Sequence, residues 1–151
     1  MFVLLGGSDH TLDKKGRMFI PARFKKVLGE QVVICACPFG SKCLWGFSEE
    51  GFDEFYEKIS SNDYDKVESL TRFISDTASF GDIDASGRVL LNSELRKFAN
   101  IDANAHLVGM KYYFEIWNPE DWANKREDID NIDFSPVVKD IKFKFGNRTN
   151  G

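Results

Sequence analysis

The chain contains two copies of one short pattern, and this internal repeat limits its possible folds more than any other feature. The pattern is an aliphatic residue, Asp, two variable residues, Gly and Arg, followed by three apolar residues. It occupies residues 12–20 and returns at residues 83–91. Because a repeat preserves local structure, we expect one architecture built twice rather than two unrelated domains.

The match between the copies continues beyond the loop. Apolar side chains spaced three and four positions apart predict a short helix over residues 24–28 and another over 95–99. The spacing between the copies then shortens by one position, which indicates a single deletion. Ser48 and Asn118 correspond at this new spacing, and each is a good N-cap for a following helix, with Pro119 suited to the first helical position. Each copy is therefore expected to contain two strands, a short helix, two more strands and a second short helix.

These elements predict a mainly β fold with short helices, in the α+β class. Apolar, β-branched and aromatic runs at residues 32–37 and 112–117 are typical of strands. A helical apolar stripe between the copies predicts a connecting helix that begins near Asn62 or Asp63. The expected divisions are residues 6–52 for the first copy, 53–80 for the connecting helical segment, 81–124 for the second copy and 125–151 for a C-terminal tail.

The loop of each copy combines three residue types with distinct roles. Gly supplies the positive φ that a tight hairpin needs, and Asp accepts hydrogen bonds from the N–H groups of the loop itself. The Arg that follows then stands on a rigid base, and its guanidinium can bind a phosphate or a guanine edge in bidentate fashion. The residues expected to shape the loops are Asp13, Gly16, Asp84 and Gly87, and those expected to bind a partner are Arg17 and Arg88.

A second interpretation of the loops is purely structural, with each Asp paired to its Arg only to close a hairpin. The charge pattern favours a binding role for the first copy, because residues 13–26 hold six basic residues against Asp13 alone. Lys14 and Lys15 lie in the loop itself and are expected to contact a polyanion. Acidic residues gather at 49–68, and the second copy is almost neutral over residues 84–97, so we expect unequal contributions.

Composition narrows the class of protein. Because 42% of residues are hydrophobic, the chain is expected to fold. The net charge of −4 argues against a surface that is positively charged throughout. No apolar run approaches the roughly 18 to 20 residues that cross a bilayer, so we expect a cytoplasmic protein without membrane contact. Three cysteines, an odd and small number, are typical of a reduced compartment.

The sequence also allows two other kinds of protein, a metal-binding protein and a hydrolase. Cys35, Cys37 and Cys43 could form a metal site, but they lack the spacing and the fourth ligand of a zinc finger, and small buried side chains are the better interpretation. Asp9 and His10 could serve a hydrolase, with Cys43 or Ser48 as nucleophile, yet none of the established catalytic motifs accompanies them. We therefore expect no enzyme, no cofactor, no metal and no catalytic residue.

The order of motifs resembles the bacterial MraZ family. The resemblance rests on the first loop in the setting His10–Arg17, the Ile-Pro-Ala that follows at residues 20–22, the second loop with its apolar run at 84–91, and Glu-Ile-Trp at 115–117. It extends from Gly6 to Trp122. Asn92 departs from the pattern, because a proline matching Pro21 is usual there, and the second loop lacks its usual charge.

The resemblance implies a fold and a function. MraZ proteins look like tandem swapped-hairpin, AbrB-like β-barrel modules, related by a pseudo-twofold axis, that assemble into rings of about eight subunits. They are nucleoid-associated transcriptional regulators, typically repressors, which bind direct repeats in double-stranded DNA upstream of the division and cell-wall gene cluster. The resemblance gives the DNA-contacting role to Arg17 and Arg88. An AbrB-like antitoxin or a protein-binding scaffold remains the alternative with the same fold.

Assembly into a homo-oligomer needs apolar surface left over from the core. With 14 Phe and 3 Trp in the chain, such surface is expected. The candidates are either Phe52, Phe55 and Tyr56 or the C-terminal Phe143 and Phe145.

Overall fold

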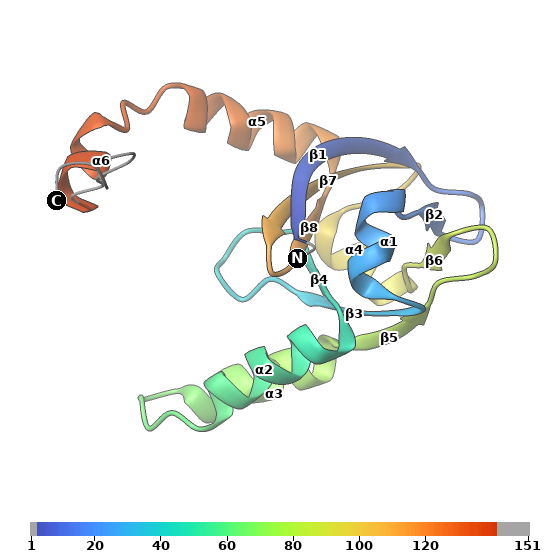
Figure 1. Ribbon diagram of the computed structural model, residues 1–151, viewed down its shortest axis with the longest axis horizontal. Helices are drawn as coiled ribbons and strands as arrows, with labels where there is room; N and C mark the ends of the chain where they lie inside the picture. The colour runs from blue at the N-terminus through green and yellow to red at the C-terminus, as the bar shows by residue number, and fades with distance from the viewer. Residues whose placement is uncertain (1–2, 142–151) are drawn as a thin grey trace, which may run out of the picture.

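The computed structural model describes residues 3–141, which contain eight strands and six helices (Figure 1). In chain order these are β1 (Leu4–Thr11), β2 (Arg17–Phe19), α1 (Ala22–Leu28), β3 (Gln31–Ala36), β4 (Leu44–Phe47), α2 (Glu49–Ser60), α3 (Val67–Thr77), β5 (Ser79–Asp82), β6 (Arg88–Leu90), α4 (Ser93–Ala99), β7 (Asn104–Lys111), β8 (Phe114–Trp117), α5 (Pro119–Asp130) and α6 (Ser135–Ile141). The α+β class is confirmed, and so is the order of elements expected within each copy.

The helix boundaries follow the local sequence signals in most places. Ser48 caps α2 by accepting a hydrogen bond from the N–H of Gly51, and Asn118 caps α5 by accepting one from Asp121. The connecting helix α3 begins at Val67, later than the expected start near Asn62, because residues 61–66 form a loop. No helix within residues 3–141 is both long enough and apolar enough to span a bilayer.

The two copies exchange strands. The main sheet has the order β1-β7-β8-β4-β3-β5 with all neighbours antiparallel, so the first strand of each copy pairs with the third strand of the other. Strands β2 and β6 pair only with each other and form a separate two-stranded ribbon. The barrel expected from the resemblance is therefore not closed by hydrogen bonds within residues 3–141, because the short β2 and β6 leave β1 and β5 as sheet edges.

A pseudo-twofold axis relates the copies, and it passes through two pairs of equivalent strands. In the ribbon, Met18 pairs with Val89, its own counterpart in the second copy. In the sheet, Trp45 pairs with Glu115, which is its counterpart at the shortened spacing. Each copy thus meets its own image at both places, as expected for two halves that complete one structure.

The spacing between equivalent positions changes more than the sequence indicated. Equivalent edge hydrogen bonds run from Leu12 to Ala103 and from Ile83 to Glu30. Glu30 therefore corresponds to Ala103. The sequence separation between these two residues is larger than the separation between Leu12 and Ile83. The second copy has two extra residues after its short helix and three fewer in its following hairpin. The expectation of a single deletion was wrong, because the two changes nearly cancel in the sequence.

Two apolar clusters cover the faces of the main sheet. The first lies between the sheet, the ribbon and the short helices, and includes Met18, Phe24, Phe114 and Ile116. The second lies under α2, α3 and α5 and centres on Trp45. Alternation along β4 places Leu44 in the first cluster and Trp45 in the second. The assembly candidates Phe52, Phe55 and Tyr56 pack partly against the second cluster, whereas Phe143 and Phe145 lie outside the described residues.

Candidate nucleic-acid interface

The first arginine loop is held by the carboxylate of Asp13. Its Oδ1 accepts hydrogen bonds from the backbone N–H groups of Lys15 at 3.0 Å and Arg17 at 2.9 Å, and its Oδ2 accepts one from Arg17 Nε at 2.7 Å. Gly16 has a φ of 88° and donates its N–H to the Asp13 carbonyl at 3.0 Å. The backbone hydrogen bond from Arg17, assisted by the guanidinium, holds the pKa of Asp13 below its ordinary value.

The second loop repeats this arrangement. The Asp84 carboxylate accepts the backbone N–H groups of Ser86 and Arg88, both at 2.9 Å, and Arg88 Nε at 3.0 Å. Gly87 has a φ of 87°. The backbone hydrogen bond from Arg88 likewise lowers the pKa of Asp84. The two loops therefore share one hydrogen-bonding scheme, although their second and third residues differ.

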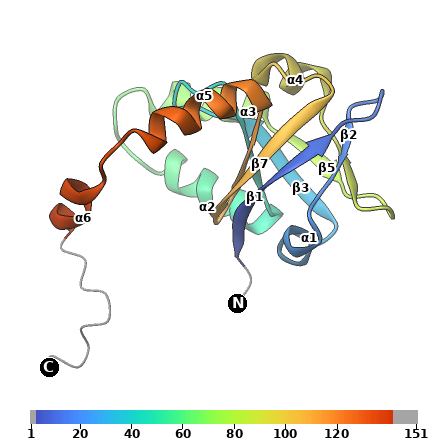
Figure 2. The ribbon, with the colours of Figure 1, turned by 90° about the horizontal axis from the view of Figure 1, so that it is seen from above.

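Strand β2, which begins at Arg17, lies at the end of the molecule away from α6 (Figure 2), and β6, which begins at Arg88, pairs with it. The side chains of Arg17 and Arg88 are 33% and 29% exposed, and Arg88 Nη1 is 3.7 Å from the carboxylate of Asp13 in the other loop. The Asp–Arg pairs of the structural interpretation are present in both loops. In the first loop the Asp13 carboxylate binds Nε of Arg17. The Nη groups of Arg17 make no hydrogen bond within residues 3–141 and can therefore bind a partner.

The ribbon between the loops adds an apolar component that the sequence analysis did not assign. Arg17 lies opposite Leu90, and Phe19 lies opposite Arg88. The central residues of the two strands are buried, so these four side chains share the outer face. Phe19 is 54% and Leu90 51% exposed. Because all three residues after each loop arginine are apolar, the sequence shows no alternation that could have marked Phe19 and Leu90 as exposed.

Arg96, on α4 of the second copy, supports the loop of the first copy. Its Nε donates to the Leu91 carbonyl at 2.9 Å, and the Leu91 N–H donates to the Gly16 carbonyl at 2.9 Å. A Cβ placed on Gly16 would lie 2.8 Å from Arg96 Nε. No signal in the sequence could have identified this contact, because it depends on the exchange of strands between the copies. The position equivalent to Arg96 in the first copy is Lys25.

The remaining basic residues of the first copy divide into two groups. Lys14 and Lys15 are exposed in the loop and form no ion pair with any described residue. Arg23 instead lies against β1, where its Nε donates to the Leu5 carbonyl at 3.0 Å. The loop lysines are therefore placed to meet a polyanion, while Arg23 holds α1 against the sheet edge.

The residues of the hydrolase alternative do not come together. The carboxylate of Asp9 is 2.7 Å from Nδ1 of His106, and His10 bonds to the Ser8 hydroxyl at 2.8 Å. Ser48 uses its hydroxyl to cap α2. Because Asp9 and His10 are consecutive in a strand, their side chains point to opposite faces, and the Asp-His dyad drawn from the sequence is wrong.

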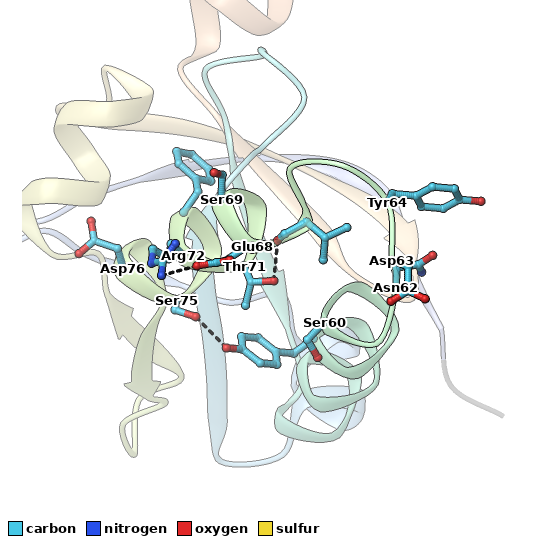
Figure 3. A pocket seen from close by; sticks show the side chains of 13 residues that line it. Ser60, Asn62, Asp63, Tyr64, Glu68, Ser69, Thr71, Arg72, Ser75 and Asp76 are labelled. Carbon is cyan, nitrogen blue, oxygen red and sulfur yellow. Dashed lines mark hydrogen bonds and ion pairs between the residues drawn. The ribbon is translucent and has the colours of Figure 1, made fainter.

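One groove of the described molecule is separate from the arginine loops. It has a volume of about 1210 Å³ and lies between α2, α3 and the loop that joins them (Figure 3). The Tyr56 hydroxyl bonds to Ser75 across it, Glu68 pairs with Arg72 on its wall, and Tyr64 stands at its rim. None of its lining residues comes from residues 13–17 or 84–88.

The fold and the loops together define a class of protein: a single chain whose two copies exchange strands and present two arginine loops on one face. The family model described as "MraZ protein, putative antitoxin-like" matches residues 3–73 and 75–140. The chain belongs to the MraZ family.

Relatives from several bacteria support this assignment. The "Transcriptional regulator MraZ" of Roseiflexus sp. (strain RS-1) is 38% identical over 81% of this chain and 85% of its own length. The protein of the same name from Thermomicrobium roseum is 35% identical over 83% of this chain and 88% of its own length. That from Caldanaerobacter subterraneus subsp. tengcongensis is 30% identical over 92% and 96%.

Proposed function

We propose that this protein is a transcriptional regulator that binds double-stranded DNA through its two arginine loops, and not an enzyme. The observation that carries the proposal is the pair of loops with one hydrogen-bonding scheme, gathered on one exposed face around Arg17 and Arg88. The relatives named as transcriptional regulators support the regulatory role.

The loops suit base recognition because they are rigid before binding. Three hydrogen bonds to each Asp carboxylate fix the backbone from which the guanidinium extends, so less conformational entropy is lost in the complex. A bidentate contact between Arg and guanine contributes about 1 to 3 kcal/mol of discrimination. Lys14 and Lys15 would bind phosphates and supply affinity that depends on salt rather than on sequence.

One such contact discriminates too weakly between DNA sequences to select a promoter, so several contacts are required. We propose that several subunits, in a ring of about eight, engage direct repeats upstream of the division and cell-wall gene cluster and repress it by occluding the promoter. Support for assembly comes from apolar side chains left exposed on the C-terminal arm, which includes Ile132, Phe134, Val137, Val138 and Ile141. In the cell, binding of this kind would place the protein at the nucleoid.

The family description also contains the word antitoxin-like, which favours one alternative: an AbrB-like antitoxin that binds a toxin protein. Two copies fused in one chain, each with an arginine loop, fit a self-contained DNA-binding unit better than a single-module antitoxin.

The test is fluorescence anisotropy with a labelled duplex that covers the DNA immediately upstream of the protein's own reading frame. We expect tighter binding than to a shuffled duplex of the same composition, and a log–log decrease of affinity with salt. A matched control is Arg72→Ala on α3, because Arg72 also pairs with a carboxylate one helical turn earlier but lies far from the loops. Equal affinity for both duplexes at all salt concentrations would rule the proposal out.

A further inference from the structure

The hairpin between β3 and β4 brings two of the three cysteines face to face. Its register pairs Cys35 with Trp45 and Ala36 with Leu44, and continues so that the Cys37 N–H donates to the Cys43 carbonyl at 3.0 Å. Directly opposed residues in such a hydrogen-bonded pair have Cα atoms about 5.5 Å apart. A disulfide accepts Cα separations of about 4.4 to 6.8 Å, so the backbone already has a suitable spacing.

The three thiols are chemically different. The Cys37 sulfur accepts the Phe39 N–H at 3.5 Å, and a hydrogen bond from the Cys43 thiol, aided by backbone N–H groups, lowers the pKa of Cys37 to about 7. Donating that hydrogen bond raises the pKa of Cys43. Burial raises the pKa of Cys35 to about 12. The geometry therefore provides one nucleophilic sulfur, one partner beside it and one inert thiol.

We propose that Cys37 and Cys43 are a redox modification site, which forms a reversible disulfide across the β3–β4 hairpin on reaction with a hydroperoxide. The Cys37 thiolate attacks the O–O bond of hydrogen peroxide, giving the sulfenic acid of Cys37 and hydroxide, which takes up a proton to become water. The Cys43 thiol then attacks that sulfur, and a second water leaves with its proton. Two thiols are oxidised and one peroxide is reduced to two waters.

Burial controls how fast this reaction proceeds. Cys37 is 3% exposed and Cys43 is fully buried, so the oxidant reaches Cys37 only when the hairpin opens locally. The middle of the short loop between them, at Phe39 and Gly40, is exposed to solvent. The disulfide can be reduced again by a small thiol such as dithiothreitol, as a reversible modification requires.

The site is distinct from the arginine loops. The hairpin lies at one end of β3, whereas the ribbon β2–β6 and both loops lie at the other end of the molecule (Figure 1). Oxidation should therefore leave DNA binding unchanged, and the inference stands whether or not the proposed function is correct. Its expected effect is a higher midpoint of thermal unfolding, because the link restricts the unfolded chain.

The chain offers a direct readout of the link. Trypsin cleaves after Lys42, between Cys37 and Cys43, so a disulfide joins two tryptic peptides that are otherwise separate. We would treat the full-length protein with hydrogen peroxide, block free thiols, digest it without reductant and analyse the peptides by mass spectrometry. We expect peptides 27–42 and 43–58 to appear joined, with loss of two hydrogens, and to separate on treatment with dithiothreitol.

Variants assign the link to its residues. The matched control Cys35→Ser should keep the joined peptides, whereas Cys37→Ser and Cys43→Ser should each lose them. The proposal is overturned if the joined peptides disappear in Cys35→Ser, or if wild-type Cys37 proceeds to the sulfinic acid without a link. The wild-type and Cys35→Ser results decide this even if a variant at Cys37 or Cys43 fails to fold.

Discussion

The two arginine loops have the same hydrogen bonds but different surroundings. In both, an Asp carboxylate accepts two backbone N–H groups and the Arg Nε, and a Gly takes a positive φ. The first loop carries Lys14 and Lys15 and is supported by Arg96 through Leu91. The second loop carries Ala85 and Ser86, and nothing lies within 4 Å of a Cβ placed on its glycine.

This comparison distinguishes the loop residues that determine the turn from those that are exposed to a binding partner. The Asp and Gly that build the turn are present in both copies, and so is the Arg. The exposed residues at the second and third positions differ in charge. Arg88 is also shared between Asp84 and Asp13, whereas Arg17 pairs with Asp13 alone. We therefore expect the first loop to contribute more to DNA affinity than the second.

The largest effect is expected from the arginines themselves. Arg17→Ala should weaken binding to the upstream duplex by at least about 10- to 100-fold, because every subunit that engages the DNA loses one bidentate contact. Arg88→Ala should weaken it by less than about tenfold, because its guanidinium is already engaged by two carboxylates. Anisotropy titrations with Arg72→Ala as control measure both. Equal losses would show that the loops are equivalent in spite of their surroundings.

Substituting alanine for the glycine of each loop should lower the free energy of unfolding by different amounts. Gly87→Ala meets only the cost of a left-handed backbone, about 1 kcal/mol. Gly16→Ala should cost about 2 to 3 kcal/mol, because its Cβ would also lie 2.8 Å from Arg96 Nε and 3.0 Å from the Leu91 carbonyl oxygen. Urea unfolding measures both.

The double variant Gly16→Ala/Arg96→Ala isolates the contact with Arg96. It should recover part of the loss seen in Gly16→Ala, since one of the two crowded groups is then absent. Equal destabilisation of the two single glycine variants would show that the close contacts of Gly16 with Arg96 and Leu91 add nothing to the cost of the left-handed backbone.

Exchanging the charge between the loops should change the salt dependence of binding. Lys14→Ala/Lys15→Ala should reduce the log–log salt slope by about two for each subunit that engages the DNA, while preserving the preference for the upstream duplex. Ala85→Lys/Ser86→Lys should increase the slope if the second loop also faces the phosphates. Anisotropy at four or more salt concentrations gives the slopes. An unchanged slope in the first variant would place the loop lysines away from DNA.

The smallest difference is expected in the response to acid. The pKa values of Asp13 and Asp84 are both lowered in the folded protein, so the ionised carboxylates stabilise it fully at pH values above their ordinary pKa, which is about 4. This stabilisation decreases progressively as the pH falls from there through the lowered values. The amide NMR signals of Gly16 and Gly87 should therefore move together below about pH 4 and stay constant between pH 6 and 8. Separate transitions would contradict the shared scheme.

Local features of this fold could be predicted from the sequence because they depend on nearby residues. The turn chemistry of each loop and the caps at Ser48 and Asn118 need only residues within four positions. The repeat then extends each local assignment to the other copy. The start of α3 was misplaced because residues 61–66 carry polar residues that a helix start and a loop share.

Long-range features could not be predicted from pattern. The alternation of apolar and polar residues shows which face of a strand is buried, but it does not identify the neighbouring strand. The pairing of β1 with β7 could therefore not be predicted from the sequence of either strand. The support of Gly16 by Arg96 follows from that pairing and was missed with it. The separate ribbon β2–β6 likewise depends on strands of only three residues that pair with each other alone.

The covalent connection between the copies has a consequence for how such a protein can evolve. Met18 and Val89 occupy the place where, in a symmetric homodimer, one residue would face itself. In a homodimer every mutation appears twice, so both halves must remain identical. Here a single gene encodes both halves, and each can acquire changes that the other does not share. Two lysines in one loop beside Ala85 and Ser86 in the other are an asymmetry that a fused pair can inherit and a homodimer cannot.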